Sequence, residues 1–440
     1  MNILHYSLGF PPYRSGGLTK YCVDLMQSQI EQGNQVGMIW AGQIRLFCRK
    51  TSIKKHKTNN KVASYEIINP LPVPLDEGIK DIDRYTAACD MQVYSDFLHE
   101  LHPDIIHIHT LMGMHKEFLD VAKSMKIRLI YTTHDYFGIC AKVTLFYNGD
   151  VCNDTECYNC EICNQTAISL KKIYLLQSSF YRKIKNNPLV KILRHSHRAN
   201  FFDGQKAQII EDSGNDSQRY KQLRNFYVSM FRKMDIIHFN STVSEKIFKY
   251  FIPDIAGKVV GITHRNISDN RKIKVFNSLK LHITYLASTM PLKGFRLLIT
   301  ALDELWHEGH RNFKLKLYCK ISIKRDYFEV NNAFTSNELN TIFDDTDLFV
   351  APSIGYDTYG FTVLEALSYG VPVIVSSRVG AKDLLKGMEN CIIESNCKEL
   401  KKKIFEMYTD RSKLVELNKN IVHNLQNSIF NNNINTVYQT

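Results

Sequence analysis

Residues 347–384 read DLFVAPSIGYDTYGFTVLEALSYGVPVIVSSRVGAKDL, and this stretch is the most informative about the fold class. The apolar run 348–351 predicts a buried strand, and the pattern of apolar positions over 361–369 predicts a helix. Gly370 ends that helix, and the apolar run VPVIVSS that follows predicts a second buried strand. Two buried strands joined by a helix are typical of a parallel α/β sheet.

The loop after the first of these strands carries residues that we expect to contact a ligand. In parallel α/β sheets, ligands bind beyond the carboxyl ends of the strands. Asp357 and the turn Gly360-Phe361-Thr362 lie there, and Glu365 follows one turn into the helix. Free amides at a helix start favour an anion, whereas carboxylates accept hydrogen bonds from hydroxyl groups. This combination suits a nucleotide sugar, with the amides on its diphosphate and the carboxylates on its sugar and ribose hydroxyls.

The spacing of the acidic residues resembles a known signature. Asp357 and Glu365 are separated by seven residues, in register with Ala-Pro-Ser, Tyr-Gly-Phe, Glu-Ala and Gly-Val-Pro between 351 and 372. The pattern resembles the donor site of retaining glycosyltransferases of family 4, in which the first acid is more often Glu. The resemblance implies that Asp357 and Glu365 are catalytic and also bind the donor, with Gly360, Phe361 and Thr362 beside them. The alternative is structural: an acid near a helix N-terminus and a Glu on a solvated helix face.

Length and composition narrow the protein class. The 440 residues are 44% hydrophobic and 23% charged, as in globular proteins of two or three domains. No apolar run approaches the roughly 20 residues of a membrane span, and the start does not resemble a secretory leader. We therefore expect a cytoplasmic protein whose eleven cysteines are reduced thiols or metal ligands. The net charge of +12 fits an anionic partner, which from charge alone is nucleic acid, a membrane surface or a diphosphate substrate.

The start of the chain predicts a βαβ unit, with strands over 2–7 and 35–39 and a helix over 18–32 between them. Gly16 and Gly17 lie at the first strand-to-helix turn, where glycine permits either close approach to a ligand or simply a tight turn. The chain contains neither G-x-G-x-x-G nor a Walker A sequence, which argues against a dehydrogenase or a P-loop nucleotidase. In family 4 transferases a Gly-Gly loop here lies over the donor, which implies a donor-binding role for both glycines.

Two further predicted strands of the first half end in histidines. His107 lies within the first strand and is interpreted as a core residue, whereas His109, at its carboxyl end, is open between core and site. The second strand is followed directly by His134 and Asp135, an imidazole and a carboxylate able to bind hydroxyls or move a proton. The Thr-His-Asp triplet resembles that of family 4, which implies that His134 lines the sugar pocket and acts in catalysis. The alternative is that Asp135 caps a helix and His134 has no role.

A group of closely spaced cysteines follows. Four thiolates satisfy tetrahedral zinc, and two-residue gaps let one turn supply two ligands. An iron–sulfur run is the second interpretation, although 164–167 lack the cysteine expected next, and free or paired thiols are the third. We expect a structural zinc held by four of five cysteines, which the spacing does not select: Cys140, Cys152, Cys157, Cys160 and Cys163.

Residues 162–202 contain no acidic side chain, and basic residues alternate there with apolar ones. Such an amphipathic stretch can lie on an anionic leaflet. The alternative is two ordinary helices with solvated lysines. Elsewhere we expect loop and short strands over 43–80, a helix over 81–101 and a strand over 232–240.

The second half begins with a predicted strand over 281–287, and Lys293 lies at the turn that follows. A lysine at such a turn is a suitable cation for a diphosphate, and its Lys-Gly context resembles family 4. The arginine that often accompanies this lysine is replaced by Ser288. We therefore expect Lys293 and helix-start amides to carry the phosphate charge.

Together these patterns predict two Rossmann-like α/β domains facing a cleft, the GT-B arrangement. We expect an acceptor-side domain over 1–262 with the cysteine-rich insert 140–163, a nucleotide-sugar domain over 263–425, and a tail over 426–440 returning to the first domain. The expected activity is retaining transfer from a nucleotide-diphosphate sugar to an acceptor hydroxyl, without a catalytic cofactor. The expected acceptor is a glycan or lipid-linked glycan of surface polysaccharide biosynthesis, with peripheral membrane contact and no nucleic acid. A non-catalytic GT-B-like scaffold with a zinc module is the alternative.

Overall fold

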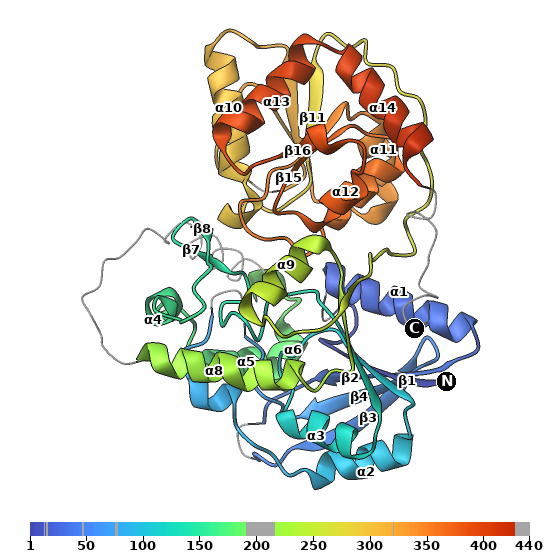
Figure 1. Cartoon of the computed structure of the whole chain (residues 1–440), viewed down its shortest axis with the longest axis vertical. Helices are drawn as coiled ribbons and strands as arrows, with labels where there is room; N and C mark the ends of the chain where they lie inside the picture. The colour runs from blue at the N-terminus through green and yellow to red at the C-terminus, as the bar shows by residue number, and fades with distance from the viewer. Residues whose placement is uncertain are drawn as a thin grey trace. The chain divides into compact units, whose positions relative to one another are not determined.

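The computed structural model describes residues 1–12, 14, 16–45, 48–74, 78–190, 216–319 and 321–426. The chain divides into two compact units. The first comprises 1–148, 152–240 and 245–261, and the second comprises 149–151, 241–244 and the described residues from 262 onward (Figure 1). Of the tail predicted over 426–440, residues 427–440 lie outside the described residues.

The first unit is built on an eight-stranded sheet in the order β10-β9-β6-β5-β1-β2-β4-β3, in which β3 alone is antiparallel to its neighbour. Its central strands are buried along nearly their whole length, as expected for parallel strands covered on both faces. The strands are β1 Asn2–Ser7, β2 Gln35–Ala41, β3 Ser52–Asn59, β4 Val62–Ile68, β5 Ile105–Ile108, β6 Arg128–Thr132, β9 Ile236–Phe239 and β10 Lys258–Val259. A separate hairpin pairs β7 Phe146–Tyr147 with β8 Asp150–Val151.

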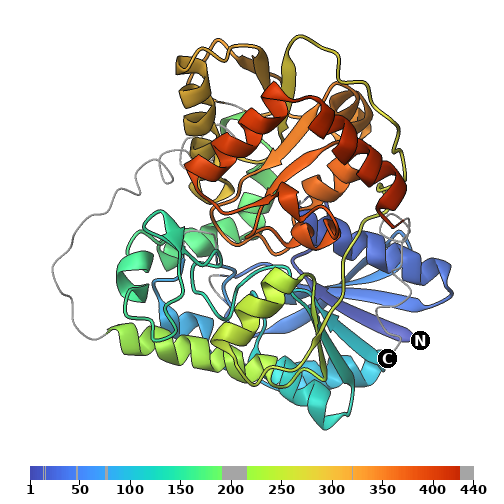
Figure 2. The same cartoon turned by 45° about the horizontal axis from the view of Figure 1, so that its top comes forward.

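Helices cover both faces of this sheet. In Figures 1 and 2, α1 lies on one side of the strands, and α2 and α3 lie on the other. The helices are α1 Gly17–Glu31, α2 Gln92–Leu101, α3 Lys116–Ser124, α4 Cys160–Asn164, α5 Leu170–Leu176, α6 Ser179–Ile184, α8 Asp216–Phe231 and α9 Thr242–Phe251, with a 3-10 turn η1 at Ile82–Tyr85.

Three local predictions were wrong. The predicted helix over 81–101 is only η1 and α2, separated by an irregular segment. The strand predicted over 232–240 begins at Ile236, because the end of α8 continues as a turn in which the amides of Lys233 and Met234 donate to the carbonyls of Met230 and Phe231, both at 3.1 Å. Residues 43–80 form more than short strands: β3 and β4 are eight and seven residues long.

The second unit has a six-stranded, all-parallel sheet in the order β13-β12-β11-β14-β15-β16. Numbered within the unit, this is the order 3-2-1-4-5-6 of a classic dinucleotide-binding fold. The strands are β11 Leu281–Tyr285, β12 Phe313–Leu317, β13 Phe328–Val330, β14 Leu348–Ala351, β15 Val373–Ser376 and β16 Ile392–Ile393. Both units are therefore Rossmann-like, as the sequence predicted.

In the second unit, α10 and α13 lie on one side of the sheet, and α11 and α12 lie on the other (Figure 1). The α-helices are α10 Phe295–His307, α11 Leu339–Asp344, α12 Phe361–Ser368, α13 Cys397–Thr409 and α14 Ser412–Asn424. The 3-10 turns are η2 Pro291–Lys293, η3 Ser336–Glu338, η4 Gly380–Leu384 and η5 Glu389–Cys391. Strands β11 and β14 are neighbours whose chain connections run in opposite directions, so the turns after them flank the switch point of the sheet.

Candidate active site

Lys293 and Asp357 lie together at the switch point of the second unit. Lys293 ends η2, after β11, and Asp357 lies in the loop after β14. The ammonium nitrogen of Lys293 is 2.5 Å from Oδ2 of Asp357, and the two side chains remain 28% and 21% exposed. Lys293 and Asp357 thus form an ion pair, although the sequence analysis assigned Lys293 to the diphosphate of a ligand and Asp357 to its hydroxyl groups.

The turn that carries Lys293 is fastened to the loop after β14. The amides of Ile354 and Gly355 both donate to the carbonyl of Leu292, at 2.9 and 2.8 Å. Gly294 has a φ of 73°, and a Cβ there would lie 1.9 Å from the carbonyl oxygen of Pro352. Glycine is therefore required at this position, because any side chain would push the two loops apart.

The backbone of Asp357 is held by the segment that follows β15. Its amide donates to the carbonyl of Arg378, and its carbonyl accepts from the amide of Gly380, both at 2.9 Å. Gly360 caps α12 with a φ of 96°, and a Cβ there would lie 2.7 Å from Cγ1 of Val379. The start of α12 therefore occupies a fixed place beside Asp357.

The first turn of α12 remains open to solvent in part. Gly360, Phe361 and Thr362 are partly exposed, whereas the remaining residues of the helix, Val363 to Ser368, are buried. No side-chain oxygen from the described residues caps the helix start. These amides are consequently in the place where an anion is favoured by the helix dipole.

Glu365 is buried and paired with a residue that the sequence did not single out. Its Oε1 lies 3.1 Å from Nε2 of His264, which is 0% exposed. Because a carboxylate only accepts, the imidazole donates this hydrogen bond. The His264 ring also packs edge-on against Phe361, with 5.2 Å between ring centroids. His264 lies in an irregular segment without periodicity, so no sequence pattern points to it.

In the first unit, Gly16 and Gly17 begin α1. Gly16 is the cap, with a φ of 117° and a ψ of 175°, and Gly17 is the first helical residue. A Cβ on Gly16 would meet nothing within 4 Å. Glycine is thus required there by its backbone conformation and not by lack of space. The role of both glycines in donor binding stays a prediction.

His134 follows β6 and lies beside two other aromatic side chains. Its Nε2 is 3.4 Å from Nδ1 of His109, and its ring centroid is 4.9 Å from that of Tyr21. Burial lowers the pKa of His134 to about 3. At neutral pH the ring therefore carries one proton and can donate through one nitrogen while accepting through the other.

A chain of hydrogen bonds leads from His134 into the core. Nε2 of His109 is 3.0 Å from Nδ1 of His5, and Nε2 of His5 is 2.7 Å from Oε1 of Gln29. Burial lowers the pKa of His5 to about 4 and that of His109 well below its usual value, so both rings are neutral. With the Gln29 carboxamide in this orientation, each Nε2 donates inward. His134 then has its lone pair on Nδ1.

His107 is a core residue, as the sequence indicated. It is fully buried, and its Nε2 is 2.8 Å from the hydroxyl of Thr132. His109 is also fully buried but belongs to the chain that ends at His134. Sequence reasoning treated these histidines separately because their proximity depends on β1, β5 and β6 being neighbours.

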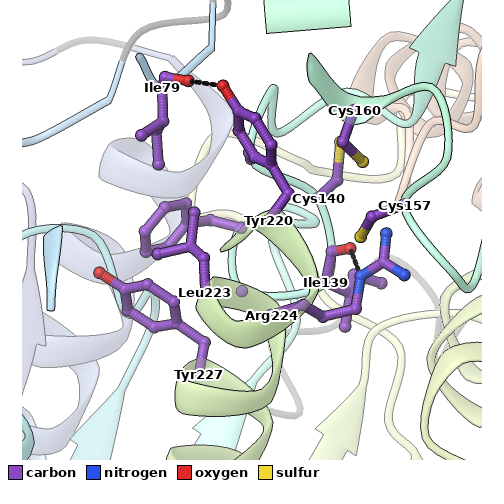
Figure 3. A pocket seen from close by; sticks show the side chains of 12 residues that line it. Ile79, Ile139, Cys140, Cys157, Cys160, Tyr220, Leu223, Arg224 and Tyr227 are labelled. Carbon is purple, nitrogen blue, oxygen red and sulfur yellow. Dashed lines mark hydrogen bonds between the residues drawn. The ribbon is translucent and has the colours of Figure 1, made fainter. Parts of the chain in front are cut away.

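The five cysteines of 140–163 gather within the first unit. Cys140, Cys157 and Cys160 line one small pocket together with Arg224 of α8 (Figure 3). Cys152 and Cys163 are partly buried. Zinc binding here stays a prediction.

Comparisons with known proteins agree with the fold. Residues 280–410 match the family described as Glycosyl transferases group 1. No significant match is found among curated protein sequences. Among the described residues, no helix is both long and apolar enough to cross a membrane.

Several solved structures are similar over nearly the whole chain. Sucrose-phosphate synthase from Thermosynechococcus elongatus is 13% identical, with a TM-score of 0.55 over 98% of this chain and 95% of that one. WaaG, a glycosyltransferase involved in lipopolysaccharide biosynthesis, is 14% identical, with a TM-score of 0.51 over 100% of both chains. Anabaena HepE in complex with UDP and glucose is 13% identical, with a TM-score of 0.53 over 100% and 97%. The chain thus has the GT-B fold, and its residues 280–410 match the Glycosyl transferases group 1 family.

Proposed function

We propose that this protein transfers a sugar from a nucleotide-diphosphate sugar to an acceptor hydroxyl, with retention of the anomeric configuration. One observation carries the proposal: two carboxylates, Asp357 and Glu365, are held by Lys293 and His264 at the switch point of the sheet in the segment that matches the glycosyltransferase family. The HepE structure contains UDP and glucose, which supports a donor of this class. The retaining stereochemistry in this proposal comes from the resemblance to family 4.

In this proposal the diphosphate binds at Lys293 and at the amides that begin α12. The ammonium group and the helix dipole stabilise the charge that develops on the leaving diphosphate, so no catalytic metal is required. A donor-binding role for Gly16 and Gly17 is part of the same proposal. The bond between the anomeric carbon and the diphosphate oxygen breaks, and the acceptor oxygen bonds to the same face of that carbon. The acceptor proton passes to the departing phosphate oxygen.

Asp357 and Glu365 have different surroundings and therefore different proposed roles. Asp357 is partly exposed and forms an ion pair with Lys293, so it orients the ammonium group and accepts hydrogen bonds from hydroxyl groups of the donor sugar. Glu365 is buried and accepts from His264, which fixes one of its oxygens. Its carboxylate then accepts hydrogen bonds from the donor sugar. His134 is proposed to accept a hydrogen bond from a donor-sugar hydroxyl at the unprotonated Nδ1, which orients the sugar for catalysis.

The proposed acceptor is a glycan or lipid-linked glycan of surface polysaccharide biosynthesis, reached from the cytoplasmic face of the membrane. Support comes from α5 and α6, where Leu175 and Phe180 are 53% and 62% exposed. Lys171 and Lys172 are exposed on the same helical segment. Apolar side chains flanked by lysines favour peripheral contact with an anionic surface. Residues 191–202 of this basic stretch lie outside the described residues.

The experiment that tests the function is turnover of nucleotide sugars by wild type and Glu365→Gln. A panel of UDP-, ADP- and GDP-sugars is screened first for thermal stabilisation, and the stabilising donor is then assayed for transfer and for slow hydrolysis. Glu365→Gln should keep the fold and lose about a hundredfold or more of the rate. Glu416→Gln, at an exposed position of α14, is the matched control and should keep full activity. Undiminished turnover by Glu365→Gln would remove the proposed role, and a chain that no donor stabilises would favour a non-catalytic scaffold.

A further inference from the structure

Gln29 is a buried polar residue on the face of α1 that packs into the core. It is 2% exposed, and the same face buries Cys22, Leu25 and Met26. Burying a carboxamide costs free energy unless the group is hydrogen-bonded. Oε1 of Gln29 lies 2.7 Å from Nε2 of His5, a fully buried residue of β1. The sugar transfer proposed above assigns no role to this contact.

His5 is the inner end of a row of three imidazoles. Its Nδ1 is 3.0 Å from Nε2 of His109, and Nδ1 of His109 is 3.4 Å from Nε2 of His134. The row crosses the sheet because β1, β5 and β6 are adjacent strands. His5 and His109 are fully buried, whereas His134 is partly exposed. The row therefore connects a buried carboxamide to the residue that is proposed to contact the donor sugar.

Each ring of this row is neutral at neutral pH. Burial lowers the pKa of His5 to about 4 and that of His134 to about 3. Burial also lowers the pKa of His109 well below its usual value, and the neighbouring rings of His5 and His134 add to this effect. The ring centroids of the two neighbours are 5.3 and 5.4 Å from that of His109. A neutral imidazole carries one N–H and one lone pair, on different nitrogens.

The protons of such a row have two consistent arrangements. Each hydrogen bond requires an N–H on one ring and a lone pair on the next, and each ring offers one of each. If one ring exchanges its N–H and its lone pair, the next ring must do the same. Either every Nε2 carries the proton and the bonds point towards Gln29, or every Nδ1 carries it and the bonds point away. The group that faces Nε2 of His5 decides between the two arrangements.

The carboxamide of Gln29 selects the first arrangement. Its oxygen faces His5 and can only accept, so Nε2 of His5 donates. His109 then donates to His5 through its own Nε2, and His134 donates to His109 in the same way. The lone pair of His134 is consequently on Nδ1. In the reversed arrangement Nδ1 would carry the proton and could not accept a hydrogen bond from a sugar hydroxyl.

We propose that Gln29 is a positioning residue that determines, through His5 and His109, which nitrogen of His134 accepts a hydrogen bond from the donor sugar. Only the contact between His134 and the sugar rests on the proposed function. The control of the proton positions belongs to the first unit alone. Control is weakest between His109 and His134, because this contact is the longest of the three.

A metal site is the other use that clustered histidines suggest. Among the described residues, the group whose potential ligand atoms lie within 4.8 Å of one another is His5, His107 and His109. This group consists of imidazoles alone, so a divalent cation would be buried there without an anionic ligand. Nδ1 of His5 and Nε2 of His109 also face each other at hydrogen-bond distance, which requires a proton on one of them. The geometry therefore favours a hydrogen-bonded row.

Side-chain ¹⁵N NMR of protein labelled at histidine tests the proton positions. The chemical shift of a ring nitrogen depends on whether it carries the proton, and His134 is identified by the signals that are lost in His134→Gln. In wild type at mildly alkaline pH we expect the proton of His134 on Nε2. A proton on Nδ1 would overturn the proposal. This measurement requires no variant at residue 29, so it decides even if such variants do not fold.

Two variants test the control by residue 29. Methionine has nearly the length of glutamine but no strong acceptor, so in Gln29→Met the N–H of His5 would lose its partner. Because buried donors are rarely left unpaired, we expect the row to reverse and His134 to carry its proton mainly on Nδ1. Gln29→Glu keeps an acceptor and should keep the proton on Nε2. Unchanged His134 signals in Gln29→Met would overturn the proposal.

Gln27→Met is the matched control, since it makes the same replacement at a partly exposed position of α1. It should keep the wild-type signals of His134 and the wild-type transfer rate. If the control variant reversed His134 as Gln29→Met does, the effect would belong to the helix and not to the carboxamide, and the proposal would be wrong.

Transfer kinetics connect the proton positions to the reaction. Gln29→Met should lose about tenfold in kcat, the effect of one neutral hydrogen bond in the transition state, and Gln29→Glu should lose less. A reversed His134 with an unchanged kcat would overturn the positioning role. A His134 that follows residue 29 in a protein that turns over no nucleotide sugar would instead contradict the proposed function, while the control by Gln29 would stand.

Discussion

Acidification should destabilise the first unit well before it protonates carboxylates. The reason is a set of buried neutral histidines in that unit. Burial lowers the pKa of His5, His115 and His238 to about 4 each, and these residues are 0%, 4% and 1% exposed. In the unfolded chain the pKa of histidine is about 6.5. Between these values the unfolded state binds more protons than the folded state, so stability is complete above about pH 6.5 and is lost as the pH falls towards 4.

The size of the effect follows from linkage. At pH 5.5 each of the three histidines takes up about 0.9 proton on unfolding. Each therefore changes the free energy of unfolding by about 1.2 kcal/mol per pH unit. Between pH 7 and pH 5 each contributes about 1.8 kcal/mol of lost stability, and the three together about 5.5 kcal/mol. His107 and His109, whose pKa values burial lowers further, act in the same direction. A loss of this order is comparable to the 5–15 kcal/mol that stabilises a typical protein.

The chain offers a convenient probe for each unit. Its two tryptophans are Trp40, in β2 of the first unit, and Trp306, in α10 of the second. Trp306→Phe leaves fluorescence that reports the first unit, and Trp40→Phe leaves fluorescence that reports the second. Urea unfolding of both variants between pH 7 and pH 5 should show the free energy of unfolding reported by Trp40 falling steeply with pH.

A variant connects the slope to a single histidine. His238→Gln should reduce the slope reported by Trp40 by about 1 kcal/mol per pH unit. His102→Gln changes an exposed histidine after α2 and should leave the slope as it is. A free energy of unfolding reported by Trp40 that stays constant from pH 7 to pH 5 would contradict this prediction, because the buried rings would then have to accept protons without cost.

Three other predictions concern the second unit. Lys293→Ala should weaken nucleoside diphosphate binding by about tenfold to a hundredfold, because it removes a hydrogen bond to a charged group, and should weaken nucleoside binding less. Equal losses of affinity for the two ligands in calorimetry would mean that the phosphates bind elsewhere. Gly294→Ala should lower the free energy of unfolding of this unit more than Gly309→Ala does. Gly309 also has a positive φ, but a Cβ there would have no described neighbour within 4 Å, so its replacement should cost about 1 to 2 kcal/mol in urea unfolding. Equal costs for the two variants would mean that the two loops at Gly294 can separate freely. His264→Phe removes a donor from Glu365 and should lower the transfer rate while leaving donor affinity nearly unchanged, so kinetics showing only a raised KM would contradict the positioning role.

Much of the fold could be predicted because its strands are buried on both faces. The apolar runs of β14 and β15 are continuous and do not alternate with polar residues. Between these strands, Gly370 follows the end of α12. The edge strand β3 is different, because most of its side chains are exposed and its sequence resembles a polar loop. The sequence therefore indicated the core strands well and the edge hairpin poorly.

The site could be predicted only one loop at a time. Lys293 and Asp357 were each expected at the carboxyl end of a strand, but their contact depends on β11 and β14 being neighbours, which is a property of strand order. The partner of Glu365 was out of reach, since His264 lies 101 residues earlier in an irregular segment. Local patterns predict which residues face a ligand, whereas the pairs among them require the topology.

The pair of Lys293 and Asp357 bears on how the proposed donor site works. A lysine next to a vacant anion site would repel other cations and would be mobile, whereas a partly exposed ion pair holds the ammonium group in place at little gain in stability. A diphosphate that enters beside α12 brings more negative charge than one carboxylate, so the ammonium group can contact it while remaining near Asp357. The carboxylate is then released in part and becomes available to the hydroxyl groups of the same ligand. In this proposal, one contact connects recognition of the two chemically different halves of a nucleotide sugar, and it accounts for a carboxylate beside the proposed phosphate site.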